Sequence, residues 1–356
     1  MELKRHFPFS GMAFRQYDPN GVLHAVVAVS AAYEVFEGRV LRLQDEQPDL
    51  LLSDIYTGSE DPPRHLIKQA DFIPYKPATD VTVLARAYTP SGEADTEWFV
   101  GIKVGDREKV LRVHGPRYWT PSVDGDGWEM GKGKAIKSLP LSYYQAFGGL
   151  VPATKPLDGA HDCHDFNPLG KGIISVENSP KDKPVRAPQI EDAHIPITDW
   201  REDYVPQGFA PLAPVWRFRE QYAGTYDTAW IKIQHPFLPA DFDYRFYNCA
   251  HPDLTFSPHL RGGERIQIAN LHPEFKQIAL NLPNDILGVV ATRLSGTIER
   301  KVMTLDGVHF DLLDTIPKLR LTWRISFPWG EGITGFDAGI VQQSAAVKSG
   351  RAQAYG

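Results

Sequence analysis

The ten residues KLRLTWRISF, at positions 318–327, alternate strictly between apolar and polar side chains. The apolar members are Leu319, Leu321, Trp323, Ile325 and Phe327. The polar members are Lys318, Arg320, Thr322, Arg324 and Ser326. Because neighbouring side chains on a β-strand point to opposite faces, this period of two predicts a half-buried strand. We expect its polar face to be solvated.

Similar strand patterns recur along the chain, whereas helical patterns are weak. The segment 98–115 predicts a hairpin. A second hairpin is predicted at 300–313, where Asp306-Gly307 is the kind of pair that favours a tight turn. Only short turns of helix are expected, for example at 142–149. The sequence therefore predicts a mainly β protein with antiparallel, β-sandwich-like units and few short helices.

A proline-rich segment separates the two regions that are rich in strand patterns. Residues 151–214 contain ten prolines and little periodicity, and the segment is too long for an ordinary connection. We expect it to wrap over the strands as irregular, extended chain. The predicted organisation is an N-terminal β unit at 1–150, the wrapping segment at 151–214, a C-terminal β unit at 215–338 and a flexible tail at 339–356.

The composition of the 356-residue chain is that of an ordinary globular protein, with 42% hydrophobic residues, 23% charged residues and a formal net charge of −6. The negative charge disfavours binding to nucleic acid or to an anionic membrane surface. No apolar run approaches the roughly 18 residues of a membrane span. The two cysteines, Cys163 and Cys249, suit a reducing compartment. We therefore expect a cytoplasmic protein without membrane insertion or a nucleic-acid partner.

The stretch RFYNCAHPDL, residues 245–254, places a thiol, an imidazole and a carboxylate at alternating positions. They belong to Cys249, His251 and Asp253. This pattern is compatible with a metal site, with a nucleophile and its base, or with a loop that carries no chemistry.

A denser cluster, His161, Cys163 and His164, offers an alternative function as a metal-dependent hydrolase. Structural zinc sites usually have two spaced pairs of ligands, and the C-x-H spacing does not match them. No nucleophile-elbow, phosphate-loop or zinc-protease motif is present. We predict no enzymatic activity and no cofactor, with these three residues as the fallback metal ligands. A second alternative is a carbohydrate-binding β-sandwich whose aromatic side chains stack on sugars.

Four sequence motifs point to one family. They are SYYQAFGG (142–149), NPLGKG (167–172), YAGTYDTAWIKIQHPFLPADFDYRFYNCAHPDL (222–254) and LRGGERIQIANLHP (260–273). Together they closely resemble the domain-of-unknown-function family of type VI secretion accessory proteins. These are adaptor or chaperone proteins of Gram-negative bacteria associated with VgrG spikes and PAAR-type or Rhs effectors. The resemblance covers roughly residues 20–330, and 222–273 is its specific part.

The resemblance implies a cytoplasmic, non-enzymatic role. Such a protein binds an effector, or its PAAR-bearing N-terminal region, and helps to load it onto the VgrG spike. The family's motif residues are candidates for structural or partner-binding roles, without individual assignments. In this sequence they are Tyr143, Phe147, Gly148, Gly149, Asn167, Pro168, Gly224, Tyr226, Asp227, Trp230, Phe246, Asn248, Pro252, Asp253, Gly262 and Glu264.

Within the 222–254 motif, the side chains favour structure over chemistry. We expect Asn248 and Asp253 to bond backbone groups of a tight loop. Cys249 is expected to pack as a small apolar side chain and Phe246 to anchor in the core. His251 is expected to be solvated.

The turn AGTYD, residues 223–227, is expected to work in a similar way. Gly224 would supply an unusual backbone angle, and Asp227 would accept hydrogen bonds from turn amides. A chaperone also needs exposed apolar and aromatic surface rimmed by polar groups, which the aromatic-rich composition provides.

Overall fold

The computed structural model describes residues 2–342, with gaps at 61–62, 125–126, 153–161, 178 and 180–181. It is mainly β, with 45% of residues in strands and 6% in helices. The predicted fold class is therefore confirmed.

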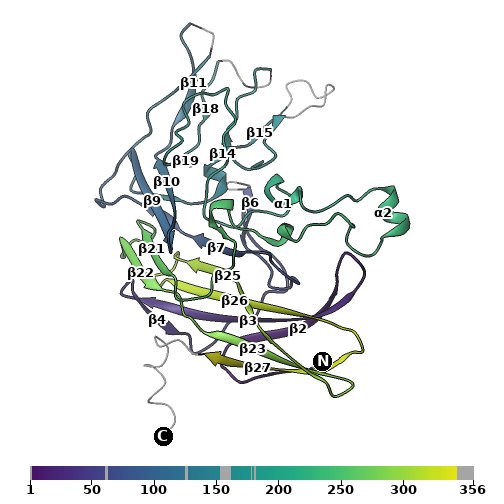
Figure 1. Cartoon of the computed structure of the whole chain (residues 1–356). Coiled ribbons are helices and arrows are strands. Elements are labelled where there is room, and N and C mark those ends of the chain that lie inside the picture. Colours follow the sequence, from purple (N-terminus) through teal and green to yellow (C-terminus); the bar gives the residue numbers. More distant parts are fainter. Residues whose placement is uncertain are drawn as a thin grey trace.

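A seven-stranded sheet forms the centre of the molecule (Figure 1). Its strand order is β2 (Ser10–Tyr17), β3 (Leu23–Phe36), β26 (Lys318–Pro328), β25 (Thr304–Asp311), β7 (Thr79–Leu84) and β20 (Thr255–Phe256), and β4 (Val40–Leu43) pairs with β3. The β25–β7 pair is parallel, and the other pairs are antiparallel. The six residues of β7 are all buried, which marks it as a central strand with both faces covered.

A four-stranded sheet packs one face against this central sheet. Its order is β1 (Glu2–Arg5), β27 (Ile333–Gln342), β23 (Ile286–Arg293) and β24 (Ile298–Val302). Alternate residues of β23, such as Leu287 and Val289, are buried in the same hydrophobic cluster as β3 and β26. The rings of Phe327 and Phe336 meet between the sheets, with centroids 5.5 Å apart. The two sheets therefore form a β-sandwich.

A five-stranded sheet extends the core on the other side of β7. Its order is β19 (Ile190–Asp192), β10 (Arg107–His114), β9 (Glu97–Val104), β21 (Arg265–Ala269) and β22 (Gln277–Asn281). The hairpin predicted at 98–115 is confirmed, because β9 and β10 pair directly and Arg107 lies opposite Val104.

The remaining elements are short. A three-stranded sheet joins β12 (Trp128–Met130), β11 (Tyr118–Pro121) and β18 (Val185–Arg186). The two-stranded pairs are β13 (Ser138–Pro140) with β8 (Arg86–Tyr88), β14 (Phe147–Gly148) with β17 (Lys171–Gly172), β15 (Leu150–Val151) with β16 (Asp162–Cys163), and β5 (Ile55–Glu60) with β6 (Pro63–Lys68). The described helices are α1 (Arg217–Glu220), α2 (Thr228–Ile233), and the 3₁₀ turns η1 (Tyr143–Gln145), η2 (Tyr244–Tyr247) and η3 (Pro252–Leu254).

Strands from the two predicted β units interleave in the same sheets. From the N-terminal range 1–150, β3 pairs with β26 and β7 pairs with β25, both of which lie in the C-terminal range 215–338. The division at residues 150 and 215 remains a prediction, but the two ranges do not build separate sheets.

The described part of the 151–214 segment contributes short strands to the sheets, and its course as an extended wrapping chain remains a prediction. Its strands β18 and β19 pair with β11 and β10. Near its end, residues 206–213 are all buried, and the amide of Val83 donates to the carbonyl of Phe209 at 2.8 Å. The segment therefore completes the core.

The polar face of β26 is buried, and the expectation that it is solvated is wrong. Arg320 and Arg324 are only 6% and 4% exposed. A guanidinium nitrogen of Arg320 lies 2.8 Å from the Asp71 carboxylate, and Arg324 pairs with Asp306. The alternation therefore separates an apolar layer from a buried layer of ion pairs.

The hairpin predicted at 300–313 is also wrong, because β25 runs straight through Asp306 and Gly307. The pairing register shifts between Leu305 and Gly307, which marks a bulge. Asp306 is 1% exposed and turns its carboxylate to Arg324. The Asp-Gly pair thus directs a carboxylate inward.

The flexible tail predicted at 339–356 begins too early. Residues 339–342 belong to β27, where Gly339 lies opposite Gly288 and Ile340 lies opposite Leu287. Residues 343–356 lie outside the described residues.

We predict that Arg324→Met strongly destabilises the protein, by about 3–5 kcal/mol, because Asp306 would remain buried without its ion-pair partner. The free energy of unfolding in denaturant measures this loss. Arg300→Met, on the exposed side of β24, is the control and should change stability by less than about 0.5 kcal/mol. Equal effects of the two substitutions would show that the buried pair has no special role.

Candidate functional site

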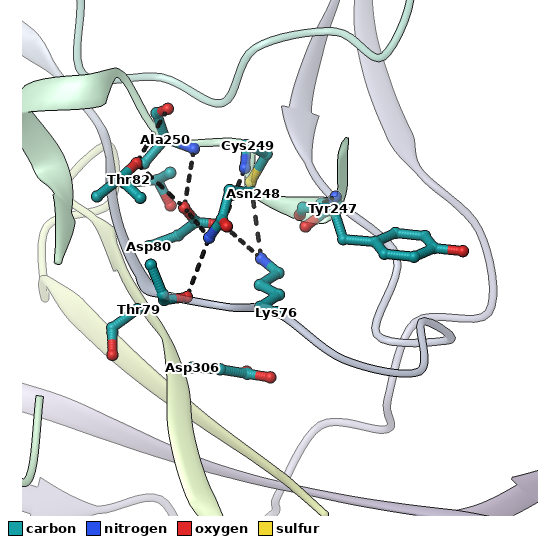
Figure 2. A network of polar contacts seen from close by, with 12 residues as sticks. Lys76, Thr79, Asp80, Thr82, Tyr247, Asn248, Cys249, Ala250 and Asp306 are labelled. Atoms are coloured by element: carbon teal, nitrogen blue, oxygen red, sulfur yellow. Dashed lines mark hydrogen bonds and ion pairs between the residues drawn. The ribbon is translucent and has the colours of Figure 1, made fainter. Parts of the chain in front are cut away.

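The signature loop (residues 248–255) is fixed to the central strand β7 by one buried carboxylate, that of Asp80 (Figure 2). Asp80 accepts hydrogen bonds from Asn248 Nδ2 at 3.0 Å and from the backbone amide of Cys249 at 2.9 Å. Asn248 Nδ2 also donates to the backbone carbonyl of Ala78 at 3.0 Å. Asn248 therefore bonds a backbone group, as the sequence predicts.

Lys76 completes this network from the other side. Its Nζ lies 2.6 Å from Asp80 Oδ2 and 4.0 Å from Cys249 Sγ. Burial opposes the charged forms, but the attraction between the two groups outweighs it, so the pKa of Lys76 is raised and the pKa of Asp80 is lowered. Burial raises the pKa of the Cys249 thiol to about 12. Cys249, which is 4% exposed, is a packed neutral thiol.

Asp253 differs from its predicted role, because its carboxylate accepts a hydrogen bond from a side chain and not from a loop amide. Lys109 Nζ donates to Asp253 Oδ2 at 2.8 Å. The predicted exposure of His251 is also wrong, since the ring is 3% exposed. Its Nδ1 lies 3.2 Å from the Asp253 amide nitrogen, and burial lowers the pKa of His251. The imidazole therefore caps the 3₁₀ turn η3, which begins at Pro252.

Phe246 is not the core anchor that the sequence predicts. It is partly exposed, and its ring lies beneath the guanidinium of Arg219, 5.2 Å from the ring centroid. Phe242, which is 9% exposed, is the more deeply buried ring of this aromatic cluster, 5.6 Å from Phe246. Arg219 also donates to the carbonyl oxygen of Phe246 at 2.9 Å, which joins α1 to η2.

A second group of candidate residues, here called the Asn167 centre (Tyr143, Phe147, Gly148, Gly149 and Asn167), forms around the fully buried Asn167. Its Nδ2 donates to the carbonyls of Tyr143 and Phe147, both at 2.8 Å. Gly148 has φ +136°, and a Cβ there would lie 2.2 Å from the carbonyl oxygen of Asn167. The amide of Gly149 donates a hydrogen bond to the same carbonyl oxygen of Asn167 at 2.9 Å. These contacts hold two of the motifs together.

Pro168, Gly262 and Glu264 lie in turns. Pro168 follows Asn167 and is partly buried. Glu264 accepts a hydrogen bond from the Arg261 amide at 2.8 Å, which closes the turn that contains Gly262. These candidates therefore shape the loops of their motifs.

The fallback metal cluster is not assembled among the described residues. His161 lies outside them, and no group of three or more potential ligands occurs within the described part of the chain. His164 is buried and its Nε2 lies 2.8 Å from Asp203 Oδ1. Cys163 is exposed, and burial together with Asp165 raises the pKa of its thiol. The His164–Asp203 pair borders a hollow of about 330 Å³.

The first two thirds of the 222–254 motif form a projection, here called the finger (residues 222–243). Its base closes where the Asp243 amide donates to the Tyr222 carbonyl at 3.0 Å. Gly224 has φ +79°, and the Asp227 side chain accepts a hydrogen bond from the Trp230 amide at 2.8 Å. Both predicted roles in this turn are confirmed. Asp227 is the N-cap of α2.

Helix α2 lies at the end of the finger, away from the sheets (Figure 1). No residue of α2 is buried. Tyr226 is 52% exposed, Ile231 is 62% exposed and Ile233 is 83% exposed. The indole of Trp230 stacks edge-on against Tyr226, with ring centroids 4.7 Å apart, and its Nε1 donates to the Phe237 carbonyl at 2.9 Å. The finger thus exposes a helix with apolar side chains to solvent.

The structure brings most of the predicted candidates into three places: the surroundings of Asn167, the signature loop and the finger. Phe246 lies in η2, and Gly262 and Glu264 lie in a separate turn. Sequence reasoning missed Asp80 and Lys76, which hold the signature loop in position, and Arg219, which holds η2. Asp80 lies at the start of an apolar strand. In the sequence, a carboxylate at this position resembles an ordinary turn residue. Only its burial inside β7 distinguishes it.

We predict that one thiol, Cys163, reacts with a water-soluble disulfide reagent in the native protein. Cys249 is buried and its thiol has a raised pKa, so it should react only after unfolding. The measurement is the number of thiols titrated with and without denaturant. Cys163→Ser should leave no reactive thiol in the folded state. Rapid reaction of two thiols in the native wild type would contradict the packed assignment of Cys249.

Comparison with known proteins found no match among curated proteins and none among solved structures. None of the helices in the described part of the chain has the length and apolar character needed to cross a membrane. A family profile described as an uncharacterized protein conserved in bacteria, DUF2169, matches residues 20–324. The match includes the Asn167 centre, the finger and the signature loop. Because it covers most of the chain, the protein belongs to the DUF2169 family of bacteria.

Proposed function

We propose that this protein is a non-enzymatic adaptor or chaperone that binds another protein through the finger. The observation that carries the proposal is α2, a helix that buries none of its residues yet exposes Ile231 and Ile233. Helices this short are unstable in water unless other contacts hold them. An apolar helix maintained at the end of a projection is suited to contact with a partner.

The finger is held by specific contacts and does not depend on burial of α2. Thr225 donates through its amide and hydroxyl to the Asp241 carboxylate, at 2.9 and 2.7 Å. Gln234 donates to the carbonyl of Pro19 in the turn between β2 and β3. The ring of Phe237 packs edge-on against Tyr17, with centroids 5.1 Å apart. A preorganised surface of this kind loses little conformational entropy when a partner binds.

The partner proposed here is a PAAR-type or Rhs effector, or its PAAR-bearing N-terminal region. In this proposal the protein keeps the effector soluble in the cytoplasm of a Gram-negative bacterium and helps to seat it on the VgrG spike of the type VI secretion system. The resemblance of the 222–273 segment to accessory proteins of that system supports this choice of partner. The apolar finger supports the mode of binding.

The enzyme and carbohydrate-binding alternatives have less support. Burial raises the pKa of the Cys249 thiol to about 12, and burial together with Asp165 raises the pKa of the Cys163 thiol, so neither thiol is an activated nucleophile. The exposed aromatic side chain of the finger, Tyr226, stacks against Trp230 edge-on and does not present a flat platform for a sugar ring.

We predict that Ile231→Glu combined with Ile233→Glu weakens effector binding at least about tenfold, because it places two charges on the contact helix. Binding is measured by co-purification and by calorimetry with a PAAR-bearing effector region from the same genome. Thermal stability should be nearly unchanged, since neither side chain is buried.

The matched control is Val123→Glu, which adds a charge at a fully exposed apolar residue outside the finger. It should leave effector binding intact. If the effector stays equally soluble and is secreted equally well without this protein, the adaptor proposal fails. If the effector binds but the finger variant binds as tightly as the wild type, the binding surface lies elsewhere.

A further inference from the structure

A small polar cavity lies where β7, β25 and β26 meet the chain that follows β6. Its volume is about 50 Å³. Its lining includes the polar side chains of Lys68, Asp71, Thr82, His309, Arg320 and Arg324. Such a volume holds a few water molecules or one small ion, and it is too small for a phosphate or an organic ligand.

The charges around the cavity do not cancel. Four cations line the cavity, Lys68, Lys76, Arg320 and Arg324, whereas only two carboxylates do so, those of Asp71 and Asp80. Lys76 pairs with Asp80, Arg320 with Asp71, and Arg324 with Asp306. Lys68 is the remaining cation, and within the described residues no carboxylate forms an ion pair with its ammonium group.

Arg320 supplies an independent sign of a missing ligand. The side chain is 6% exposed and lines the cavity, and its Nε is buried without a hydrogen-bond partner. A buried N–H of a guanidinium group normally has an acceptor, and an orphan of this kind points to a water molecule or an ion.

The pKa values of two titratable groups beside the cavity are lowered by neighbouring cations. Burial, reinforced by Arg320, lowers the pKa of Lys68 to about 8. Burial, reinforced by Lys68 and Arg320, lowers the pKa of His309 to about 3, so this ring is neutral. Its Nδ1 lies 2.9 Å from the hydroxyl of Thr82, which fixes the ring in the cavity wall. The carboxylates of Asp71 and Asp311 act on Lys68 in the opposite direction, but burial and Arg320 outweigh them.

We propose that this cavity binds a halide ion, chloride in the cell, with Lys68 and the Nε–H of Arg320 as its charged donors. The bound anion would neutralise the excess positive charge and satisfy the orphan donor. Because the cavity borders β7, β25 and β26, its occupant stabilises the centre of the fold and, through Asp80 and Lys76, the signature loop.

The test compares sodium chloride with sodium gluconate at constant ionic strength and pH 7, where Lys68 is charged. The thermal midpoint of the wild type should be about 2–4 °C higher in chloride, because only the folded state has the site. Lys68→Met keeps the length of the side chain but removes the charge, and it should abolish this difference. Lys318→Met is the matched control, since Lys318 is a surface lysine of the same sheet, and it should retain the difference.

A direct measurement covers the case in which Lys68→Met fails to fold. Crystals of the wild-type protein grown or soaked in sodium bromide should show an anomalous peak in the cavity beside Arg320. A peak there supports the proposal. Bromide confined to the protein surface, or an equal chloride effect in both lysine variants, overturns it.

Discussion

The carboxylate of Asp80 receives hydrogen bonds from three consecutive residues of the signature loop, Asn248, Cys249 and Ala250, and it pairs with Lys76. Because Asp80 sits on β7, and β7 joins β25 to β20, this one group fixes the loop to the middle of the central sheet. The finger precedes the loop in sequence, with the 3₁₀ turn η2 between them. Asp80 therefore fixes the chain that follows the finger, whereas contacts with Pro19 and Tyr17 hold the finger itself. Removing a charge from such a network leaves its partner buried and uncompensated, which is strongly unfavourable.

The polar layer beside β26 explains how the protein can have an inner face that is neither solvated nor apolar. On one side of the strand, residues such as Trp323 pack in the hydrophobic core. On the other side, Arg320 and Arg324 are enclosed by Asp71 and Asp306. Ion pairs of this kind add little net stability, but they discriminate strongly against misplaced strands, because a shift by one residue would bury each charge without its partner.

The sequence predicts the fold class and several local features well, because those depend on neighbouring residues. The β9–β10 hairpin and the cap at Asp227 are examples. It fails where burial is decided by distant chain. The sequence predicts a solvated Arg320 because its partner Asp71 lies about 250 positions away. It predicts a hairpin at 300–313 because Arg324, which pairs with Asp306 at the bulge, lies 18 positions further along the chain. The sequence predicts the packed state of Cys249 but not the burial of His251, because an imidazole occurs both in solvent and in the protein interior.

The pairing of β3 with β26 has a consequence for synthesis of the chain. Residues 23–36 emerge from the ribosome early, whereas their partner at 318–328 emerges nearly last. Between these events, a long strand that is almost wholly buried in the finished sheet has one edge without its final neighbour. Domains normally fold as units during translation, and such delayed long-range pairing makes nascent chains slow to fold and prone to aggregate. A truncated messenger RNA would therefore yield insoluble fragments, and a protein of this design needs protection while it is being made.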